Sequence, residues 1–386
     1  MNRADLLPRR IDWWIVLLAA TIALVGVAFV HSATTGTDDE GLARRQLVFL
    51  AASVVGAAVA VVVPYARFHR GAASLYVLAL LALVAVLFVG AVINGARRWI
   101  RIPGAGFLLQ PSEFGKLAVV LALASWLRFR DRASGFDGVV VPALITAVPA
   151  ALVFVEPDLG SSLVYWPILF AICYAAGAPV RALSWLFLAG VLVIAVGWFT
   201  VFHEYQRSRA EVWASHFGWD RTTIDTDPAV RQVLLDDGYQ PWQSLIAIGS
   251  GGLTGFGYAQ GPQNRFDFLP YRAGDYVFAV VAEEFGWLGA VGLLAAYLAL
   301  VLALFLLAMR TRERFGRLLV VGVATWLGTQ AFLHVAICAW FLPAKGLPLP
   351  LVSQGGSVTL AAALGIGLCL NVGARREPVL AADGFR

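Results

Sequence analysis

Apolar residues dominate the chain in long runs, and short polar or basic segments separate one run from the next. A run of about 20 residues is the length that an α-helix needs to cross the hydrocarbon core of a bilayer. The pattern therefore predicts an all-α, polytopic integral membrane protein with ten transmembrane helices. The predicted spans are 12–31, 46–64, 73–93, 113–128, 138–155, 161–176, 182–202, 276–308, 317–341 and 357–373.

The distribution of basic residues between the spans predicts the orientation. Sixteen arginines lie on one side of the membrane, whereas the short loops on the other side hold five arginines and one lysine. Short cytoplasmic loops are enriched in basic residues, so we expect both termini in the cytoplasm. The one long loop, about 203–275, is then extracytoplasmic. We expect a single membrane domain over 1–386 that carries this loop before its eighth helix.

Composition supports a membrane protein and argues against a nucleic-acid-binding one. The 386 residues are 60% hydrophobic and only 14% charged, against about 25% charged in soluble domains. The net charge of +5 comes from arginines at span ends, where topology explains them. Cys173, Cys338 and Cys369 fall singly within apolar runs, without metal-ligand spacing. The expected surroundings are membrane lipids, with no nucleic acid.

Four polar or glycine-rich stretches differ from ordinary connecting loops. They are residues 94–116, 156–162, 243–276 and 341–357. By the predicted orientation all four lie on the extracytoplasmic side, whereas the cytoplasmic loops are short and basic. This arrangement predicts an outward-facing active site.

The first stretch, "NGARRWIRIPGAGFLLQPSEFGK", begins with Arg97, Arg98, Trp99 and Arg101. Arginine and tryptophan are also common anchors at the membrane interface. The functional alternative is an anion site for a lipid pyrophosphate, because arginine binds phosphate through two parallel hydrogen bonds. Both interpretations remain open from the sequence.

The same stretch ends with Glu113 and Lys116, which are three residues apart and share one face of a helix. They could form an ion pair that orders the site, or they could act in catalysis. In the next stretch, "EPDLGSS", Pro157 and Asp158 are typical of a helix start. For that stretch a structural role is favoured over a functional one.

Two stretches read as re-entrant loops. The segment "AIGSGGLTGFGYAQG" (247–261) is rich in glycine but lacks the strand and the spacing of a phosphate-binding loop. In "LPLPLVSQGGS" (347–357) the prolines interrupt a helix, and the glycines allow the backbone to approach a ligand closely. Ser353 and Gly355 are the candidate binding residues of this loop.

Asp275 stands where the eighth apolar run begins. Aspartate is favoured as a helix N-cap, which would explain it without a function. At 100° per residue, a stripe of small residues continues below it: Ala279, Ala282, Gly286, Gly289 and Gly292. Such a stripe allows close helix packing or leaves a groove for a lipid tail. Glu283 and Glu284 lie off this face, and we expect structural partners for both.

These motifs together resemble the SEDS family (shape, elongation, division and sporulation). The resemblance rests on "GARRWI", "QPSEFGK", "EPDLGSSL", "QSLIAIGSGGLTGFGYAQG", "FLPYRAGDYVFAVVAEEFGWLG" and "LPAKGLPLPLVSQGGS", and runs from about residue 10 to residue 375. It implies a peptidoglycan glycosyltransferase that polymerises lipid II on the outer face of the bacterial cytoplasmic membrane. It also implies a class B penicillin-binding protein as partner.

The resemblance assigns roles to particular residues. The family's essential aspartate falls on Asp275, its Arg-Trp pair on Arg98 and Trp99, and its Glu-Lys pair on Glu113 and Lys116. The segments "AQG" and "AEEFG" favour the elongation branch (RodA), whereas "PAKGL" leans toward the division branch (FtsW). The chain departs from the family in "AGDY" for "HTDF", in "SQGGSV" for "SYGGSS", and in a longer stretch over 211–238.

The implied reaction inverts the anomeric carbon of an undecaprenyl-pyrophosphate-linked donor, so it needs one base to activate the incoming hydroxyl. Asp275 is the candidate base. The leaving pyrophosphate needs compensating positive charge, with or without a divalent cation (Mg²⁺ or Mn²⁺). The cationic candidates are Arg97, Arg98, Arg101 and Lys116. Two alternatives from other classes are a lipid II flippase and a scaffold that only positions the partner.

Overall fold

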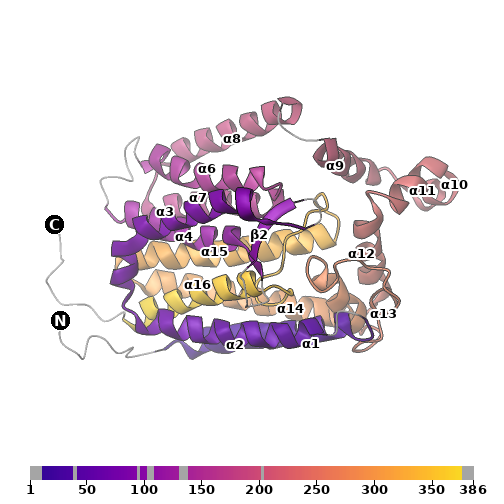
Figure 1. The fold of residues 1–386 in the computed structure, drawn as a ribbon, viewed down its shortest axis with the longest axis horizontal. Helices are drawn as coiled ribbons and strands as arrows, with labels where there is room; N and C mark the ends of the chain where they lie inside the picture. The colour runs from indigo at the N-terminus through magenta and orange to yellow at the C-terminus, as the bar shows by residue number, and fades with distance from the viewer. Residues whose placement is uncertain are drawn as a thin grey trace.

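The computed structural model describes residues 11–37, 41–93, 96–101, 108–129, 138–200 and 204–375. Outside these ranges lie both chain ends and residues 38–40 and 130–137. Residues 94–95 and 102–107 of the first polar stretch, 201–202 of the seventh predicted span and residue 203 of the long loop also lie outside. Among the described residues, ten long helices form the body (Figure 1). They are α1 (Trp13–Thr34), α2 (Gly41–Val62), α3 (Tyr65–Val89), α4 (Pro111–Trp126), α6 (Val140–Val155), α7 (Leu159–Ala176), α8 (Val180–Thr200), α14 (Val277–Arg310), α15 (Arg314–Cys338) and α16 (Gly356–Ala374).

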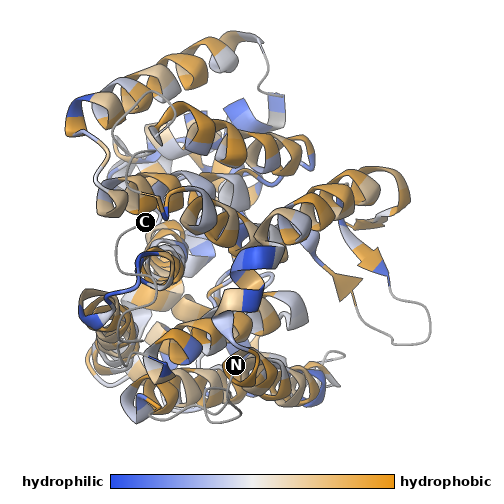
Figure 2. Cartoon of the chain, turned by 90° about the vertical axis from the view of Figure 1, so that its left-hand side faces the viewer, coloured by the Kyte–Doolittle hydropathy of each residue, from blue (hydrophilic) through white to orange (hydrophobic). Residues whose placement is uncertain are grey.

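The helices confirm the prediction of a multi-pass membrane protein. Within the described ranges, eight helices are long and apolar enough to cross a membrane. The other two of the ten helices of the body, α4 and α6, have 16 residues each. Each of the ten predicted spans overlaps one helix, whereas the count of ten crossings stays a prediction. Apolar residues cover most sides of the long helices (Figure 2), as expected for segments solvated by lipid.

Burial divides the helices into an inner group and an outer group. In the most apolar window of each helix, 83% of the residues of α16 and 61% of those of α15 are buried, against 6% in α8. Helix α15 packs against α4, α7, α14 and α16. The inner helices therefore position the polar loops at their ends, and α8 presents its apolar side chains outward.

A small antiparallel sheet follows α3, which the all-helical prediction did not include. Its strands are β1 (Ala91–Ile93), β2 (Ala96–Arg101) and β3 (Leu108–Leu109), in the order β1-β2-β3. The third predicted span wrongly continued to residue 93, whereas α3 ends at Val89. Three apolar residues such as those of β1 extend a helical run as well as they form a strand, so periodicity cannot separate the two.

The predicted long loop is mostly helical. It holds α9 (Glu204–His216), α10 (Arg221–Thr226), α11 (Pro228–Leu235), α12 (Tyr239–Ser250) and α13 (Pro262–Arg265). Val230 and Leu234 of α11 form a small separate core with Trp340, which follows α15. Helices α9 to α13 extend beyond one end of the bundle (Figure 1). The contact of Val230 and Leu234 with Trp340 attaches this part of the loop to the end of α15.

Helix α14 is broken at Gly286, where φ is +63° and ψ is −157°. The segment 251–257 supplies the hydrogen bonds that the break leaves open. The N–H groups of Phe256 and Gly257 donate to the carbonyls of Glu283 and Glu284, at 3.2 and 2.8 Å. In return, Trp287 and Leu288 donate to residues 252 and 253, at 2.8 and 3.1 Å. The glycine-rich segment is thus a backbone partner of α14.

This contact shows that the groove interpretation of the small-residue stripe was wrong at its centre. A Cβ on Gly286 would lie 2.5 Å from the nitrogen of Gly255. A Cβ on Gly251 would lie 2.0 Å from the carbonyl oxygen of Ala282. The chain's own backbone therefore fills the space that a lipid tail would need. The predicted common face also does not extend beyond residue 286, because a regular rotation of 100° per residue requires an unbroken helix.

Candidate active site

Asp275 lies in the turn immediately before α14 and is half-buried. It is not the N-cap of this helix: Tyr276 occupies that position, and no side chain caps the helix there. The N–H of Asp275 donates to the carbonyl of Tyr271 at 3.0 Å, and the Sγ of Cys338 donates to its carbonyl at 3.6 Å. The backbone of Asp275 is thus held in place by hydrogen bonds. Its carboxylate does not cap α14, so the explanation of Asp275 as a helix N-cap was wrong.

Two further segments converge on this carboxylate. A Cβ on Gly346 would lie only 2.7 Å from Oδ2 of Asp275, so the backbone of residue 346 passes directly beside it. A Cβ on Gly160, in the first turn of α7, would lie 3.3 Å from the carbonyl oxygen of Gly346. Three segments distant in sequence, around residues 160, 275 and 346, therefore meet at one point.

Burial raises the pKa of Asp275 to about 6, and the negative charge of Asp158 adds to this increase. The positive charges of Arg98 and Arg209 act in the opposite direction. The carboxylate therefore lies within the electrostatic reach of one acid and two cations. A carboxyl with a pKa close to neutrality can take up and release a proton under physiological conditions, as a general base must.

A third cation, Lys345, belongs to the same site. Burial lowers its pKa to about 8, and the charge of Arg209 contributes to the decrease while Asp158 opposes it. Arg209 comes from α9 and donates its Nη1 to the carbonyl of Ala344 at 3.2 Å. The long loop therefore returns a guanidinium to the segment that passes Asp275.

Asp158 confirms the expected helix start and also extends the site. It is the N-cap of α7 and accepts a hydrogen bond from the N–H of Ser161 at 3.1 Å. Its Oδ2 accepts from Nε2 of Gln110 at 3.3 Å. Glu156, two residues earlier, is buried. Its burial and, to a smaller extent, the negative charge of Asp158 raise its pKa to about 8, whereas the positive charge of Arg98 acts in the opposite direction.

Arg98 is anchored to the turn between α6 and α7. Its Nε donates to the carbonyl of Glu156 at 3.1 Å, and its Nη2 donates to the carbonyl of Pro157. Arg97 instead donates to the carbonyls of Leu87 and Phe88, each at 3.3 Å. Arg98 therefore lies within electrostatic reach of Asp275, whereas the side chain of Arg97 is directed toward the end of α3.

The remaining members of the first stretch lie on β2. Trp99 is half-buried and pairs with Ala91 in the sheet, and Arg101 is exposed. No contact of either residue with Asp275 is present in the described structure. Their roles in substrate binding, like that of Arg97, stay predictions.

Glu113 and Lys116 form a fully buried ion pair, with Oε1 and Nζ 2.7 Å apart. Nζ also donates to Oε1 of Gln330 at 2.9 Å, and Nε2 of Gln330 donates to the carbonyl of Pro348 at 2.9 Å. The pair thus connects α4 to α15 and to the loop that precedes α16. This geometry supports the ordering role that was one of the two alternatives.

Ser353 and Gly355 hold this loop in position. The hydroxyl of Ser353 donates to the carbonyl of Gly274, next to Asp275, and accepts from the N–H of Leu349 at 2.7 Å. The N–H of Gly355 donates to Oε1 of Gln46 at 3.2 Å. Both residues therefore position the backbone around Asp275, and direct contact with substrate stays a prediction.

Glu283 and Glu284 have the structural partners that we expected. The carboxylate of Glu283 accepts from the N–H groups of Gln263 and Asn264, at 2.6 and 3.2 Å. Glu284 accepts from Nδ2 of Asn264 at 2.7 Å and from the hydroxyl of Ser32. These bonds tie α13 and α1 to the part of α14 that precedes the break at Gly286.

Sequence reasoning missed Arg209, Lys345, Gly346 and Glu156 as members of the site. Lys345 and Gly346 were within a singled-out stretch, so their combination of cation and glycine was an available signal. Arg209 lies in the long loop, and nothing in its neighbourhood distinguishes it from a surface residue. Among the described residues, no group of three His, Cys, Asp or Glu side chains could hold a metal ion.

The comparisons with known proteins agree with this arrangement. The family model for the FtsW, RodA and SpoVE cell cycle proteins matches residues 9–377. This chain belongs to the SEDS family. Its relatives include the peptidoglycan glycosyltransferase MrdB of Escherichia coli, which is 33% identical over 94% of this chain and 93% of its own length.

A second SEDS relative, from Saccharophagus degradans, carries the name "Probable peptidoglycan glycosyltransferase FtsW" and is also 33% identical, over 91% of this chain and 89% of its own. A solved structure described as a peptidoglycan synthase complex that coordinates polymerization and crosslinking contains a chain with a TM-score of 0.77 and 32% identity. The match covers 95% of this chain and 98% of that one. The fold is therefore that of a SEDS protein along nearly its whole length.

Proposed function

We propose that this protein is a peptidoglycan glycosyltransferase that polymerises lipid II into glycan strands. The observation that carries the proposal is the half-buried Asp275, with a pKa of about 6, set among Arg98, Arg209 and Lys345. A titratable carboxylate beside several cations is suited to a reaction that needs one base and releases a pyrophosphate. The names of the relatives MrdB and FtsW support the same activity.

In this mechanism Asp275 accepts the proton of the attacking sugar hydroxyl. The hydroxyl oxygen forms a bond to the anomeric carbon of the donor, and the bond from that carbon to the undecaprenyl pyrophosphate breaks. The α linkage of the donor becomes a β linkage, so the reaction inverts. Positive charge near the departing pyrophosphate lowers the barrier, and Arg209, Lys345 and Arg98 supply that charge.

The candidate residues divide by their contacts. Arg98 positions the α6–α7 turn as well as contributing charge, because carbonyl groups occupy its Nε and Nη2. Lys116 is fully buried and contributes through the ion pair with Glu113. Asp275 and Asp158 could bind a divalent cation together with the pyrophosphate, although the described carboxylates do not form a metal site by themselves.

The orientation and the partner complete the proposal. Both termini are cytoplasmic and the Asp275 site faces outward, as the positive-inside rule predicts. A class B penicillin-binding protein is the proposed partner, supported by the structural likeness to a chain of a peptidoglycan synthase complex. The motifs favour a role in elongation and rod shape, whereas the relatives of the two branches are equally similar.

The purified protein incubated with lipid II alone distinguishes the candidate functions. A polymerase produces glycan strands, a flippase moves lipid II across a vesicle membrane without joining it, and a scaffold does neither. We expect polymer, and we expect its loss in Asp275→Asn. Lipid II transport without polymer by the folded protein would overturn the proposal.

A further inference from the structure

Two fully buried side chains, His334 and Cys338, lie near the C-terminal end of α15. They are four residues apart and share one face of the helix, and Nε2 of His334 lies 3.6 Å from Sγ of Cys338. A buried histidine needs partners for its ring nitrogens, because an unpaired polar atom in the interior is unfavourable. The partners of His334 therefore indicate what this residue does.

One ring nitrogen of His334 holds the segment beside Asp275. Nδ1 lies 2.7 Å from the carbonyl oxygen of Leu347. A carbonyl can only accept, so Nδ1 carries the ring proton and donates it. Leu347 directly follows Gly346, whose backbone passes beside Oδ2 of Asp275. This hydrogen bond therefore fixes the chain one residue away from its contact with the carboxylate.

The other ring nitrogen leads to the backbone of Asp275. With the proton on Nδ1, Nε2 of the neutral ring is an acceptor. The thiol of Cys338 then lies between two acceptors, Nε2 of His334 and the carbonyl oxygen of Asp275, each 3.6 Å from Sγ. The carbonyl of Cys338 is in turn fixed by the hydroxyl of Ser244 on α12, at 2.7 Å. The thiol thus connects the imidazole to the backbone of Asp275.

We propose that His334 is a positioning residue that sets the distance between Gly346 and the carboxylate of Asp275, with Cys338 as its second contact. The pair holds both sides of this approach, Leu347 on one side and the carbonyl of Asp275 on the other. The inference rests on the proposed function, in which Asp275 is the base, and it names the groups that hold this base in place. In this role the imidazole acts through its neighbours and does not touch the reacting atoms.

The size of the effect follows from the hydrogen bond that is lost in His334→Leu. Leucine has a similar size but cannot donate, and a carbon atom stays about 3.3–3.6 Å from a carbonyl oxygen, against 2.7 Å for Nδ1. Residue 347 must then retreat by about 0.6–0.9 Å, and its neighbour Gly346 shifts with it relative to Asp275. Because a misplacement of about 1 Å can reduce a rate about 10²-fold, we expect kcat to fall at least about tenfold.

The experiment measures polymerisation by the full-length purified protein over a range of lipid II concentrations. In His334→Leu we expect the lower kcat with KM changed by less than about threefold, because the base moves while the cations of the site remain. His334→Asn places an N–H donor at the position of Nδ1 and should recover kcat to within about threefold of the unmodified protein. If His334 only filled space, the smaller asparagine would be the worse replacement.

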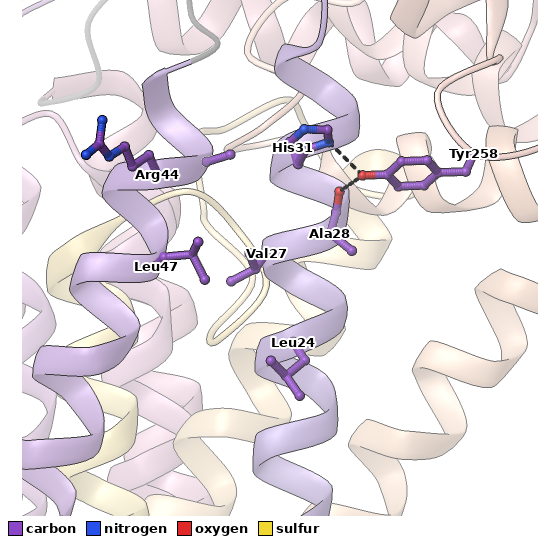
Figure 3. Close-up of a pocket in the computed structure, with 8 residues that line it drawn as sticks. Leu24, Val27, Ala28, His31, Arg44, Leu47 and Tyr258 are labelled. Atoms are coloured by element: carbon purple, nitrogen blue, oxygen red, sulfur yellow. Dashed lines mark hydrogen bonds between the residues drawn. The ribbon is translucent and has the colours of Figure 1, made fainter.

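Two control variants separate positioning from a general loss of packing. His31→Leu makes the same substitution at a histidine that lines a pocket between α1 and α2 and lies 2.9 Å from the hydroxyl of Tyr258 (Figure 3). Ser244→Ala removes a buried hydrogen bond from the same end of α15 but leaves both contacts of His334 intact. Each control should keep kcat within about twofold, and the melting temperature shows that each variant is folded.

Infrared titration of the Asp275 carboxyl tests the same inference without turnover. The carboxyl band is identified by its absence in Asp275→Asn. Release of Gly346 admits water to the carboxylate, so in His334→Leu the titration midpoint should move downward from about 6, whereas in His31→Leu it should stay in place. Absence of polymer from the unmodified protein would reject the proposed function, and this titration would still decide whether His334 positions Asp275.

Three outcomes would overturn the proposal. A normal kcat and an unchanged titration midpoint in His334→Leu would mean that the bond to Leu347 does not control Asp275. Equal falls of kcat in His334→Leu and His334→Asn would show that the donor at Nδ1 is not what matters. A higher KM with an unchanged kcat would assign His334 to the binding of substrate by its loop instead of the placement of the base.

Discussion

The backbone of Gly346 passes beside the carboxylate of Asp275, and a side chain added at this glycine can move the carboxylate without removing it. Gly346→Ala would place a Cβ 2.7 Å from Oδ2 and 3.3 Å from Cγ of Asp275. Ordinary contacts of this kind begin near 3.4 Å. The carboxylate must therefore retreat by about 0.7 Å, and misplacement of a catalytic group by about 1 Å can reduce a rate about 10²-fold.

We expect Gly346→Ala to reduce polymerisation of lipid II at least about tenfold. The effect on stability should be small, below about 1 kcal/mol, because a single side chain can rotate away from the new methyl group. The assay compares glycan formation with the melting temperature on the same preparation. A large fall in activity with an unchanged melting temperature is the expected result.

The matched control is Gly274→Ala, next to Asp275 in the chain. A Cβ there would meet only the carbonyl oxygen of Tyr271, at the ordinary distance of 3.7 Å. This variant adds the same methyl group one residue from the carboxylate without touching it, so it should keep near-normal activity. Full activity in Gly346→Ala would refute the argument that the position of Asp275 limits the reaction.

Asp275→Asn should reduce polymerisation about 10²–10⁴-fold without loss of folding; normal glycan products on a gel would contradict its role as base. Because burial raises the pKa of Asp275 to about 6, the rate of the unmodified protein should fall as the pH decreases through 6 and level off above it; a flat profile between pH 5 and 8 would count against this. Lys116→Ala should destabilise the protein by about 3–5 kcal/mol, whereas Lys116→Met with Glu113→Leu should restore most stability in thermal unfolding; an equally unstable double variant would exclude this account. Gly286→Ala should lose at least about 2 kcal/mol of stability, and Gly292→Ala, with open space around its Cβ, should be neutral; equal melting temperatures would contradict the packing at the break.

Sequence reasoning predicted the helices because lipid imposes a simple rule on them. A segment that crosses hydrocarbon must be apolar over a fixed length and must satisfy its own backbone hydrogen bonds. The pattern therefore located a helix at each predicted span. It did not reveal β1, because three apolar residues at the end of a longer apolar run carry no distinct period.

The site was predicted only in part because its contacts join residues distant in the chain. Asp275 stood out as a carboxylate at the start of an apolar run, and Asp158 was identified as a helix start. The proximity of Gly346 to Asp275, and of Arg209 to Lys345, depends on how loops return to the bundle. The break at Gly286 was missed for the same reason, since a distant segment supplies its hydrogen bonds.

The break in α14 also constrains the order in which the protein assembles during biosynthesis. Segment 277–310 has 34 residues and, as one continuous helix, would be about 51 Å long. If it entered the bilayer already broken, the N–H groups of Trp287 and Leu288 would meet hydrocarbon without acceptors, each at a cost of several kcal/mol. A continuous helix is therefore the favoured form at insertion. The kink then forms together with the packing of segment 251–257, because the backbone groups of that segment pair with those of the broken helix.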